Sequence, residues 1–359
     1  MTALPWLMCK VSIIIPVYQG GSPFVQCLKS VRNFAATAWE VIVVIDGEDD
    51  VSLQLAQRSG YRVLQLHRNA GPAKARNLGA EVATGDILFF MDADVSLAPD
   101  TLSRIQAAFQ GNVNCDALIG SYDDQPGSQN FLSQYKNLLH HYTHQHGRSQ
   151  ASTFWGACGA IRKSVFMAIG GFDEAYRRPS IEDIELGYRL RRHGYRIVLD
   201  KQVQVKHLKR WGIRSLLKAD FFYRALPWTR LIWRDRCFVN DLNLDTHSRL
   251  SVLSVYALVA LLVLSMVWPW LFPLAIGCSL LLIALNAPVY QFFWKKRSFL
   301  FALGVIPWHW LYYAYSGIAF LMGTLQYWIQ KNHQPSLVCQ TPSVEFSIIE
   351  FATASYREH

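Results

Sequence analysis

Between Leu250 and Trp294 the chain carries no charged residue. Two apolar runs, LSVLSVYALVALLVLSMVWPW and LFPLAIGCSLLLIALNAPVYQFFW, follow one another there, and each is long enough to cross roughly 30 Å of hydrocarbon as a helix. After Lys295, Lys296 and Arg297 comes a third, FLFALGVIPWHWLYYAYSGIAFLMGTLQYWI. One such run could be a buried helix of a soluble protein, but three in succession predict a membrane region at 250–330. We expect helices at 250–268, 271–294 and 299–329, followed by a tail at 331–359.

The segment before this region combines cationic and aromatic side chains. Residues 201–236 hold ten Lys and Arg against Asp220 and Asp235, within a net charge of +9. Long cationic side chains and large rings at helical spacing are typical of a helix in the membrane interface, which we predict at 206–249. Nucleic acid is the other partner that such a composition indicates, but the adjacent apolar runs argue against it. The candidate contacts to membrane or acceptor are Arg210, Trp211, Arg224 and Arg230.

Charge and cysteine placement predict the compartment. The positive-inside tendency puts the Lys295–Arg297 loop and the basic segment on the cytoplasmic side, separated by two crossings. We therefore expect a multi-pass protein of the cell (inner) membrane with a cytoplasmic catalytic domain. The seven cysteines are scattered singly, which favours a reducing compartment over a disulfide framework. The apolar patch ALPWLM near the start has no basic flank or cleavage pattern and is not expected to be a signal peptide.

The first 205 residues have the pattern of an α/β domain. VSIIIPVYQG, WEVIVVIDGEDD, YRVLQLH and DILFFMDADV read as strands, and the segments between them as helices. Apolar runs without alternation are typical of a parallel sheet covered on both faces. Because ligands of such sheets bind beyond the carboxyl ends of the strands, the acids at Asp46 and at Asp92 and Asp94 stand where a ligand is expected.

Asp92 and Asp94 form a DxD tripeptide after a strand. On an extended chain both side chains would point the same way, and a hard cation shared with substrate phosphates would relieve their repulsion. Mg²⁺ and Mn²⁺ both suit such oxygen ligands. Two solvated loop acids are the alternative. Phosphotransferases of the haloacid-dehalogenase type also use a strand-end DxD, but on the first strand of their domain, and here three strands precede it.

Five segments in order resemble family 2 of the glycosyltransferases, which have the GT-A fold. They cover about residues 10–210 and read VSIIIPVYQG, VIVVIDGEDD, RNAGPAKARNLGAEVATGDILFFMDADV, WGACGAIRKSVFMAIGGFDE and IEDIELGYRLRRHGYRIVLD. The resemblance implies a Rossmann-like, mostly parallel catalytic domain, and a nucleotide-diphosphate sugar as donor.

The resemblance also implies which residues bind the donor. Asp46 would contact the base, with Asp49 as the alternative because the usual first acid is Ile45 here. The backbone around Pro16 and Tyr18 would line the base and ribose pocket. Basic contacts to the nucleotide fall on Lys74 and Arg76, with a structural ion pair as the equal alternative for Arg76. The DxD residues Asp92 and Ala93 would lie against the ribose or the water shell of the metal.

Four further residues are implied to carry the chemistry. Asp94 would coordinate Mn²⁺ or Mg²⁺ at the diphosphate. Glu182 and Asp183 match the Glu-Asp pair of inverting members, with Asp183 as general base near a helix N-terminus. If the acceptor is a phosphate, Asp183 would only orient it. His207 takes the Gln position of the Gln-x-x-Arg-Trp motif of processive members, and is either a third metal ligand or a packing residue.

These features together predict an inverting glycosyltransferase that moves a sugar to a lipid-linked acceptor at the cytoplasmic membrane face. A polyprenyl phosphate, a lipid-linked saccharide or a glycolipid precursor would serve. A processive polysaccharide synthase is the alternative within the class, weakened by the missing Gln. A non-catalytic sugar-nucleotide-binding scaffold is the alternative from another class.

Overall fold

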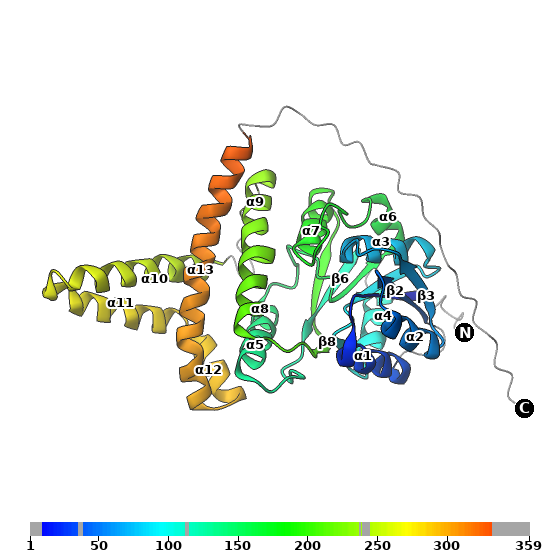
Figure 1. Cartoon of the computed structure of the whole chain (residues 1–359), viewed down its shortest axis with the longest axis horizontal. Coiled ribbons are helices and arrows are strands. Elements are labelled where there is room, and N and C mark those ends of the chain that lie inside the picture. Colours follow the sequence, from blue (N-terminus) through cyan, green and yellow to red (C-terminus); the bar gives the residue numbers. More distant parts are fainter. Residues whose placement is uncertain (1–8, 35–38, 112–114, 237, 239–244, 332–359) are drawn as a thin grey trace, which may run out of the picture. The chain divides into compact units, whose positions relative to one another are not determined.

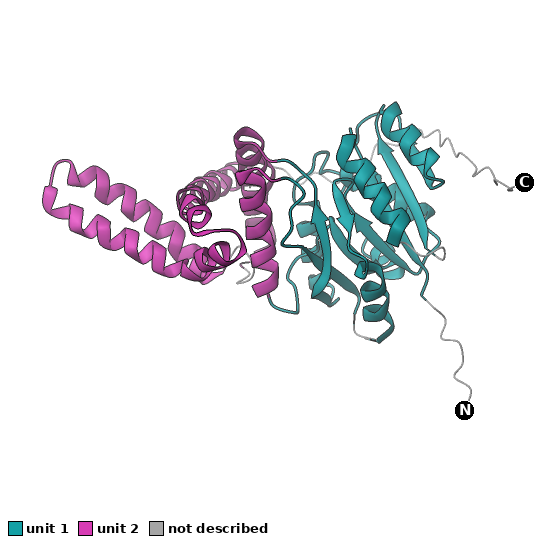
Figure 2. Ribbon diagram, turned by 90° about the horizontal axis from the view of Figure 1, so that it is seen from below, with its two compact units in different colours: residues 1–128, 148–210, 338–359 teal, residues 129–147, 211–337 magenta. Residues whose placement is uncertain are grey.

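The structure, a computed structural model, describes residues 9–34, 39–111, 115–236, 238 and 245–331. The apolar patch near the start and almost all of the predicted tail therefore lie outside the described residues. The chain divides into two compact units (Figure 2). Unit 1 comprises residues 1–128, 148–210 and 338–359, and unit 2 comprises residues 129–147 and 211–337. The boundary predicted at 205 thus moves to 210, and residues 129–147 leave the predicted catalytic range.

Unit 1 alternates strands and helices. Its strands are β1 (Val11–Val17), β2 (Glu40–Asp46), β3 (Arg62–Leu66), β4 (Ile87–Met91), β5 (Val95–Leu97), β6 (Ala117–Tyr122), β7 (Cys158–Arg162) and β8 (Ile197–His207). Its helices are α1 (Gly21–Phe34), α2 (Asp50–Arg58), α3 (Pro72–Val82), α4 (Thr101–Gly111), α6 (Lys163–Ala168) and α7 (Glu182–Arg192).

The eight strands form one sheet in the order β3-β2-β1-β4-β7-β6-β8-β5. The half β3-β2-β1-β4 is parallel, as predicted, whereas β7 runs antiparallel to both β4 and β6. The half beyond β4 is therefore mixed. Pro16, which has no N–H to donate, is tolerated in this interior strand because the β1–β4 pairing stops at Ile14.

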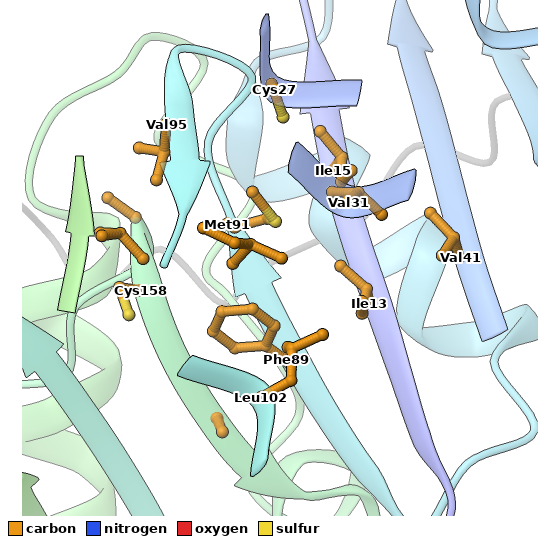
Figure 3. Close-up of a cluster of buried hydrophobic side chains, with 14 of the residues drawn as sticks. Ile13, Ile15, Cys27, Val31, Val41, Phe89, Met91, Val95, Leu102 and Cys158 are labelled. Carbon is orange, nitrogen blue, oxygen red and sulfur yellow. The ribbon is translucent and has the colours of Figure 1, made fainter. Parts of the chain in front are cut away.

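Both faces of the sheet are covered by helices. Ile13, Ile15 and Phe89 point to the face that α1, α2 and α4 cover, and Figure 3 shows part of this cluster. Ile14 and Phe90 point to the other face, where α3, α6 and α7 pack. Neighbouring residues on one strand thus enter opposite cores, which explains why the strands read as unbroken apolar runs.

Unit 2 is helical. Its elements are α5 (Phe131–His146), α8 (Ile213–Lys218), the π-helix η1 (Ala219–Ala225), α9 (Leu226–Asp235), α10 (Thr246–Ser265), the 3₁₀-helix η3 (Pro269–Leu271), α11 (Phe272–Leu285), α12 (Ala287–Lys296) and α13 (Phe299–Lys331). In Figure 1, α10 and α11 run side by side as a hairpin, and α9 lies along α13. The predicted interfacial segment corresponds to α8, η1 and α9.

The apolar runs form helices, but not three equivalent spans. Among the described residues only α10 is by itself long and apolar enough to cross a membrane. The second predicted helix is broken at Asn286, where η3 with α11 and the following α12 meet at a bend of 60°, as in a broken span or a re-entrant loop. The third, α13, is one helix of 33 residues that continues through Pro307 and does not meet the same criterion. The prediction of three spans is therefore not supported.

Candidate functional site

The candidate site lies in unit 1, where β1, β2 and β4 end. Tyr18 follows β1 and is 56% exposed, Asp46 closes β2, and Asp92 follows β4. These three strands are parallel neighbours, so their carboxyl ends share one edge of the sheet. Asp183, Glu182 and His207 come from α7 and from the end of β8.

The DxD tripeptide forms a turn between β4 and β5. The Val95 amide donates to the Asp92 carbonyl over 3.2 Å, and Ala93 and Asp94 lie in the turn itself. The expectation that both aspartates extend side by side along a strand is therefore wrong. Each carboxylate has a partner of its own: Asp92 pairs with Arg76, and Asp94 faces His207.

Arg76 ties the DxD turn to the start of α7. Its guanidinium is buried and donates to Asp92 Oδ1 over 2.7 Å and to Glu182 Oε1 over 2.9 Å. Glu182 is itself buried and accepts the Ser180 amide over 2.9 Å. Arg76 therefore forms the structural ion pair that was the alternative to a direct contact with the donor. The predicted catalytic role of Glu182 does not fit these contacts, because both of its oxygens are used in positioning.

Asp94 and His207 form the part of the site that best suits a cation. His207 Nε2 stands 3.6 Å from Asp94 Oδ2, and the imidazole stacks on Tyr122 with ring centroids 4.4 Å apart. Burial opposes ionisation of Asp94, but the nearby His207 and Lys209 outweigh it and hold the pKa of Asp94 below its ordinary value. The Asp94 carboxylate is a donor that suits Mn²⁺ or Mg²⁺, and the His207 ring nitrogen beside it is a second potential donor.

The described residues contain no group of three or more His, Cys, Asp or Glu side chains arranged to hold a metal. Asp92 does not complete such a group with Asp94 and His207, since Arg76 engages it. The donor set therefore fits a cation that takes its remaining oxygens from substrate phosphates, as Mg²⁺ usually does. It does not fit a cage built from protein ligands alone.

Asp183 has the environment of a general base. Its Oδ2 accepts the Gly156 amide over 3.1 Å, and its Oδ1 accepts the Ile184 amide over 2.8 Å in the first turn of α7. Burial, followed by the charge of Glu182, raises the pKa of Asp183 to about 6, against the opposing effects of Gly156 and Arg76. A half-buried carboxylate with a pKa near neutrality is suited to accept a proton from a hydroxyl group.

Gly187 determines how closely α7 approaches the segment before Gly156. A Cβ at Gly187 would lie 2.2 Å from the Phe154 amide nitrogen, which no side chain can tolerate without a backbone shift. The absence of a Cβ at this one helical position therefore helps to bring Asp183 to the Gly156 amide.

We expect Gly187→Ala to lower the free energy of unfolding by about 1–3 kcal/mol, the usual cost of overpacking. Gly111→Ala at the end of α4 is the matched control, because a Cβ there meets nothing within 4 Å. Thermal unfolding of both variants in detergent measures the difference. Equal stability of the two variants would show that α7 is not held at this distance.

Asp46 holds the loop between β3 and α3, and its contact to the base stays a prediction. It is 3% exposed, and its two oxygens accept the amides of Ala70 and Gly71 over 2.7 and 2.9 Å. Burial raises the pKa of Asp46 even though these two amides act in the opposite direction. Asp49, the alternative, is less buried, but caps α2 through the Ser52 amide over 3.1 Å.

The loop that precedes α7 packs over the start of α3. Gly71 has φ +96°, and a Cβ there would lie 2.6 Å from the Arg177 carbonyl carbon, so this position favours glycine on both counts. Lys74 pairs with Glu174 of the same loop over 3.0 Å. The donor contact predicted for Lys74 therefore competes with an ion pair that holds this loop.

The acceptor candidates are divided between the units. Arg210 is exposed at the end of unit 1. Trp211 belongs to unit 2 and is 4% exposed, so the prediction that it faces membrane or acceptor is wrong. It packs with Leu132 and Leu216. Arg224 and Arg230 are exposed on η1 and α9.

The sequence reasoning missed three participants. Tyr122 stacks on His207, Glu174 holds Lys74, and Gly156 donates to Asp183. A local signal existed only for Gly156, inside WGACGA. The other two depend on contacts between residues far apart in the chain.

With this geometry in view, comparisons with known proteins identify the domain that holds the site. The family model described as "Glycosyl transferase family 2" matches residues 12–170, and that of the "N-terminal domain of galactosyltransferase" matches residues 136–210. The chain contains a family 2 glycosyltransferase domain. Residues 12–170 hold β1 from its second residue, all of β2 to β7 and the DxD turn, while Asp183 and His207 fall within the second match.

Individual relatives match only parts of the chain. "Uncharacterized glycosyltransferase YibD" of Escherichia coli is 43% identical over 94 residues, which is 25% of this chain and 27% of that protein. "Validoxylamine A glucosyltransferase" of Streptomyces hygroscopicus is 25% identical over 265 residues, 60% of this chain and 61% of its own. The chain thus matches less than two thirds of the length of either relative.

A solved structure extends the likeness of the fold. The mannosyltransferase PcManGT from Pyrobaculum calidifontis superimposes with a TM-score of 0.56 at 16% identity, over 88% of both chains. At this identity the comparison speaks for the fold alone. Together with the family domain and the sheet order, it identifies unit 1 as a GT-A fold, as the sequence predicted.

Proposed function

We propose that this glycosyltransferase moves one sugar from a nucleotide-diphosphate sugar to a lipid-linked acceptor, with inversion at the anomeric carbon. The observation that carries the proposal is the chain of contacts through Arg76. One buried guanidinium connects Asp92 of the DxD turn with Glu182, the neighbour of the candidate base Asp183. Residues suited to a diphosphate and to a proton transfer are thereby held in one site.

Asp94 and His207 are the proposed ligands of Mn²⁺ or Mg²⁺. The cation would stabilise the negative charge that develops on the leaving nucleotide diphosphate. PcManGT, which shares the fold, was solved in complex with GDP-Man and Mn²⁺. Asp92 is held away from the role of ligand by Arg76, and its proposed contact is the ribose.

Asp183 is the proposed base. Its carboxylate accepts the proton of an acceptor hydroxyl as the oxygen attacks the anomeric carbon. The Gly156 amide fixes one of its oxygens, and the raised pKa makes the carboxylate a stronger proton acceptor than an ordinary aspartate. Arg76 and Glu182 contribute by positioning α7.

The proposal of a lipid-linked acceptor at the cytoplasmic face of the cell membrane rests on unit 2. Its helix α10 is long and apolar enough to cross a membrane, and α9 combines exposed Arg230 and Arg234 with Trp228 and Trp233. Cations beside rings at helical spacing are typical of an interfacial helix. A lipid phosphate would meet Arg224 or Arg230.

The test is nucleotide release by the full chain in detergent, measured with UDP- and GDP-sugars and a membrane lipid extract. We expect release from one donor that requires both the lipid extract and Mn²⁺ or Mg²⁺. Removal of the cation with EDTA should abolish release, and added Mn²⁺ should restore it. The reason is that the cation stabilises the negative charge on the leaving nucleotide diphosphate.

The same assay separates the alternatives. Donor binding without release in any lipid extract would support the non-catalytic scaffold. A long carbohydrate product from a single donor would support the polysaccharide synthase. Full release in EDTA would contradict the assignment of Asp94 and His207 to a metal.

A further inference from the structure

The α10–α11 hairpin has the surface of a lipid-embedded element. No charged residue occurs from 250 to 294, and the exposed large side chains of α10 and α11 within this stretch are apolar. Those of the far half include Leu262, Val263, Met266, Val267, Trp268, Trp270, Phe272 and Leu274. Arg249 is an exposed cation in the first turn of α10, and Lys295 and Lys296 are exposed at the end of α12. Such cations complement anionic headgroups.

The two ends of this hairpin are held together. Asn286, at the end of α11, donates to Ser251 Oγ of α10 over 3.0 Å, and accepts the Tyr313 hydroxyl of α13 over 2.7 Å. Further out, the Cys278 thiol contacts the Ser254 carbonyl at 3.2 Å. The end of α11 therefore lies beside the start of α10.

The remaining apolar helix, α13, packs on α10, α11 and α12 through apolar side chains, but it also has polar partners near its start, at its middle and in its second half. Near its start, Phe301 packs on Phe131 of α5 with centroids 4.8 Å apart, and Arg297 donates to Gln134 of α5 over 2.6 Å. Helix α5 is the polar sequence FLSQYKNLLHHYTHQH, quite unlike the apolar hairpin.

At the midpoint of α13 lies a buried ion pair. The Tyr315 hydroxyl donates to Asp220 Oδ2 of η1 over 2.8 Å, and Asp220 also accepts Lys136 Nζ of α5 over 2.6 and 2.7 Å. Arg224, with its side chain 45% exposed, stands 3.9 Å from the same carboxylate.

The second half of α13 lies against the cationic helix α9. Trp233 donates to Thr324 Oγ1 over 2.8 Å, and Arg230 donates to Gln330 Oε1 over 3.0 Å. A Cβ at Gly323 would lie 2.8 Å from the Thr229 side chain, so the two helices are in close contact.

A spanning α13 would carry these polar groups into hydrocarbon. About 20 residues are needed to cross, and every stretch of that length within Phe299–Lys331 contains Tyr315. Two stretches put Tyr315 nearest a surface, 299–318 and 312–331. The first takes the packing of Phe301 on the polar helix α5 into hydrocarbon, and the second takes Thr324 and its α9 partner towards mid-depth. Charged side chains inside hydrocarbon are costly and rare.

We propose that only the α10–α11 hairpin enters the bilayer, and that α13 lies in the plane of the membrane surface together with α9. The bilayer lipid is the partner of the hairpin surface, and anionic headgroups are the partner of the exposed cations Arg249, Lys295 and Lys296. The inference rests on the membrane association in the proposed function and goes beyond it. It makes the number of crossings even, so the two ends of the chain lie on one side.

The test uses the full chain with different epitope tags at its N- and C-termini, in sealed membrane vesicles of one orientation. Protease is added outside before and after detergent, and alkaline carbonate extraction of the same vesicles reports insertion. Neither measurement depends on donor turnover.

We expect the chain to resist carbonate extraction, and the two tags to be cleaved together or protected together. Tags on opposite sides in a carbonate-resistant chain would overturn the inference and leave the proposed function intact. Release by carbonate would overturn both the inference and the membrane part of the proposed function. Loss of nucleotide release with tags on one side would overturn the proposed function alone.

Discussion

Replacing Asp183 with asparagine is expected to lower kcat for transfer to a hydroxyl acceptor by about 10²–10⁴-fold, the range typical of a lost general base. Asparagine keeps an oxygen that can accept the Gly156 amide over the present 3.1 Å, so α7 should stay in place. The amide has no basic lone pair for the acceptor proton. Initial rates of nucleotide release at saturating donor measure the effect.

The pH profile provides a second, independent signature. A base must be deprotonated to act, so a raised pKa moves the pH at which activity appears to a higher value. Because the pKa of Asp183 is raised to about 6, kcat/KM of the wild type should climb with pH up to about 6 and level off above it. The asparagine variant should lose this acidic limb.

Asp50→Asn in the first turn of α2 is the matched control, because this aspartate is exposed and lies outside the site. It should leave both the rate and the profile unchanged. If Asp183→Asn kept the full rate with a hydroxyl acceptor, the base assignment would fall. Full retention confined to a phosphate acceptor would instead indicate that Asp183 only orients an already ionised nucleophile.

The parallel half of the sheet could be predicted because its signals are local. β1 to β4 are unbroken apolar runs, and their helices carry their own boundaries, such as Pro72 at the start of α3 and Gly60 after α2. The mixed half has weaker signals. β8 alternates polar and apolar residues over IVLDKQVQVKH, and β5 has only three residues, so neither was expected as a strand.

The sequence predicted which residues lie at the site better than it predicted what each of them does. Arg76 has its partners 16 and 106 residues away, and no local pattern reveals that one guanidinium joins Asp92 and Glu182. Asp46 stands at the predicted strand end, yet the loop at Ala70 and Gly71 occupies its oxygens. Motif positions thus identify where a ligand binds, whereas the partners of each side chain depend on tertiary contacts.

The membrane region illustrates the same limit. Hydropathy correctly indicated helices in all three apolar runs, but a sequence does not state what lies beside each helix. The exposed hairpin and the polar surroundings of α13 differ mainly in such neighbours: α13 receives Asp220 and Arg230 from another segment. A buried polar partner changes the environment of a helix without changing its own composition.

Asp94→Asn is expected to reduce metal-dependent nucleotide release by about 10²–10³-fold. A cation at the phosphates stabilises the charge that develops in the transition state by several kcal/mol, and this substitution weakens its binding. The substitution removes the charge of the side chain that faces His207 but keeps its size. The apparent affinity for Mn²⁺, measured by titrating release against Mn²⁺ concentration, should weaken along with the rate. A rate that excess Mn²⁺ partly restores would show that the loss lies in metal binding.

Asp100→Asn provides the matched control, since Asp100 is an exposed aspartate of the same segment whose carboxylate pairs with Arg104 over 2.6 Å. It should keep the wild-type rate and the wild-type Mn²⁺ titration. Donor binding measured without metal should be similar in Asp94→Asn and in the control, because Asp94 acts on the donor through the cation. Equal activity of the two variants, or an unchanged Mn²⁺ titration in Asp94→Asn, would assign the DxD turn to ribose binding through Asp92 alone.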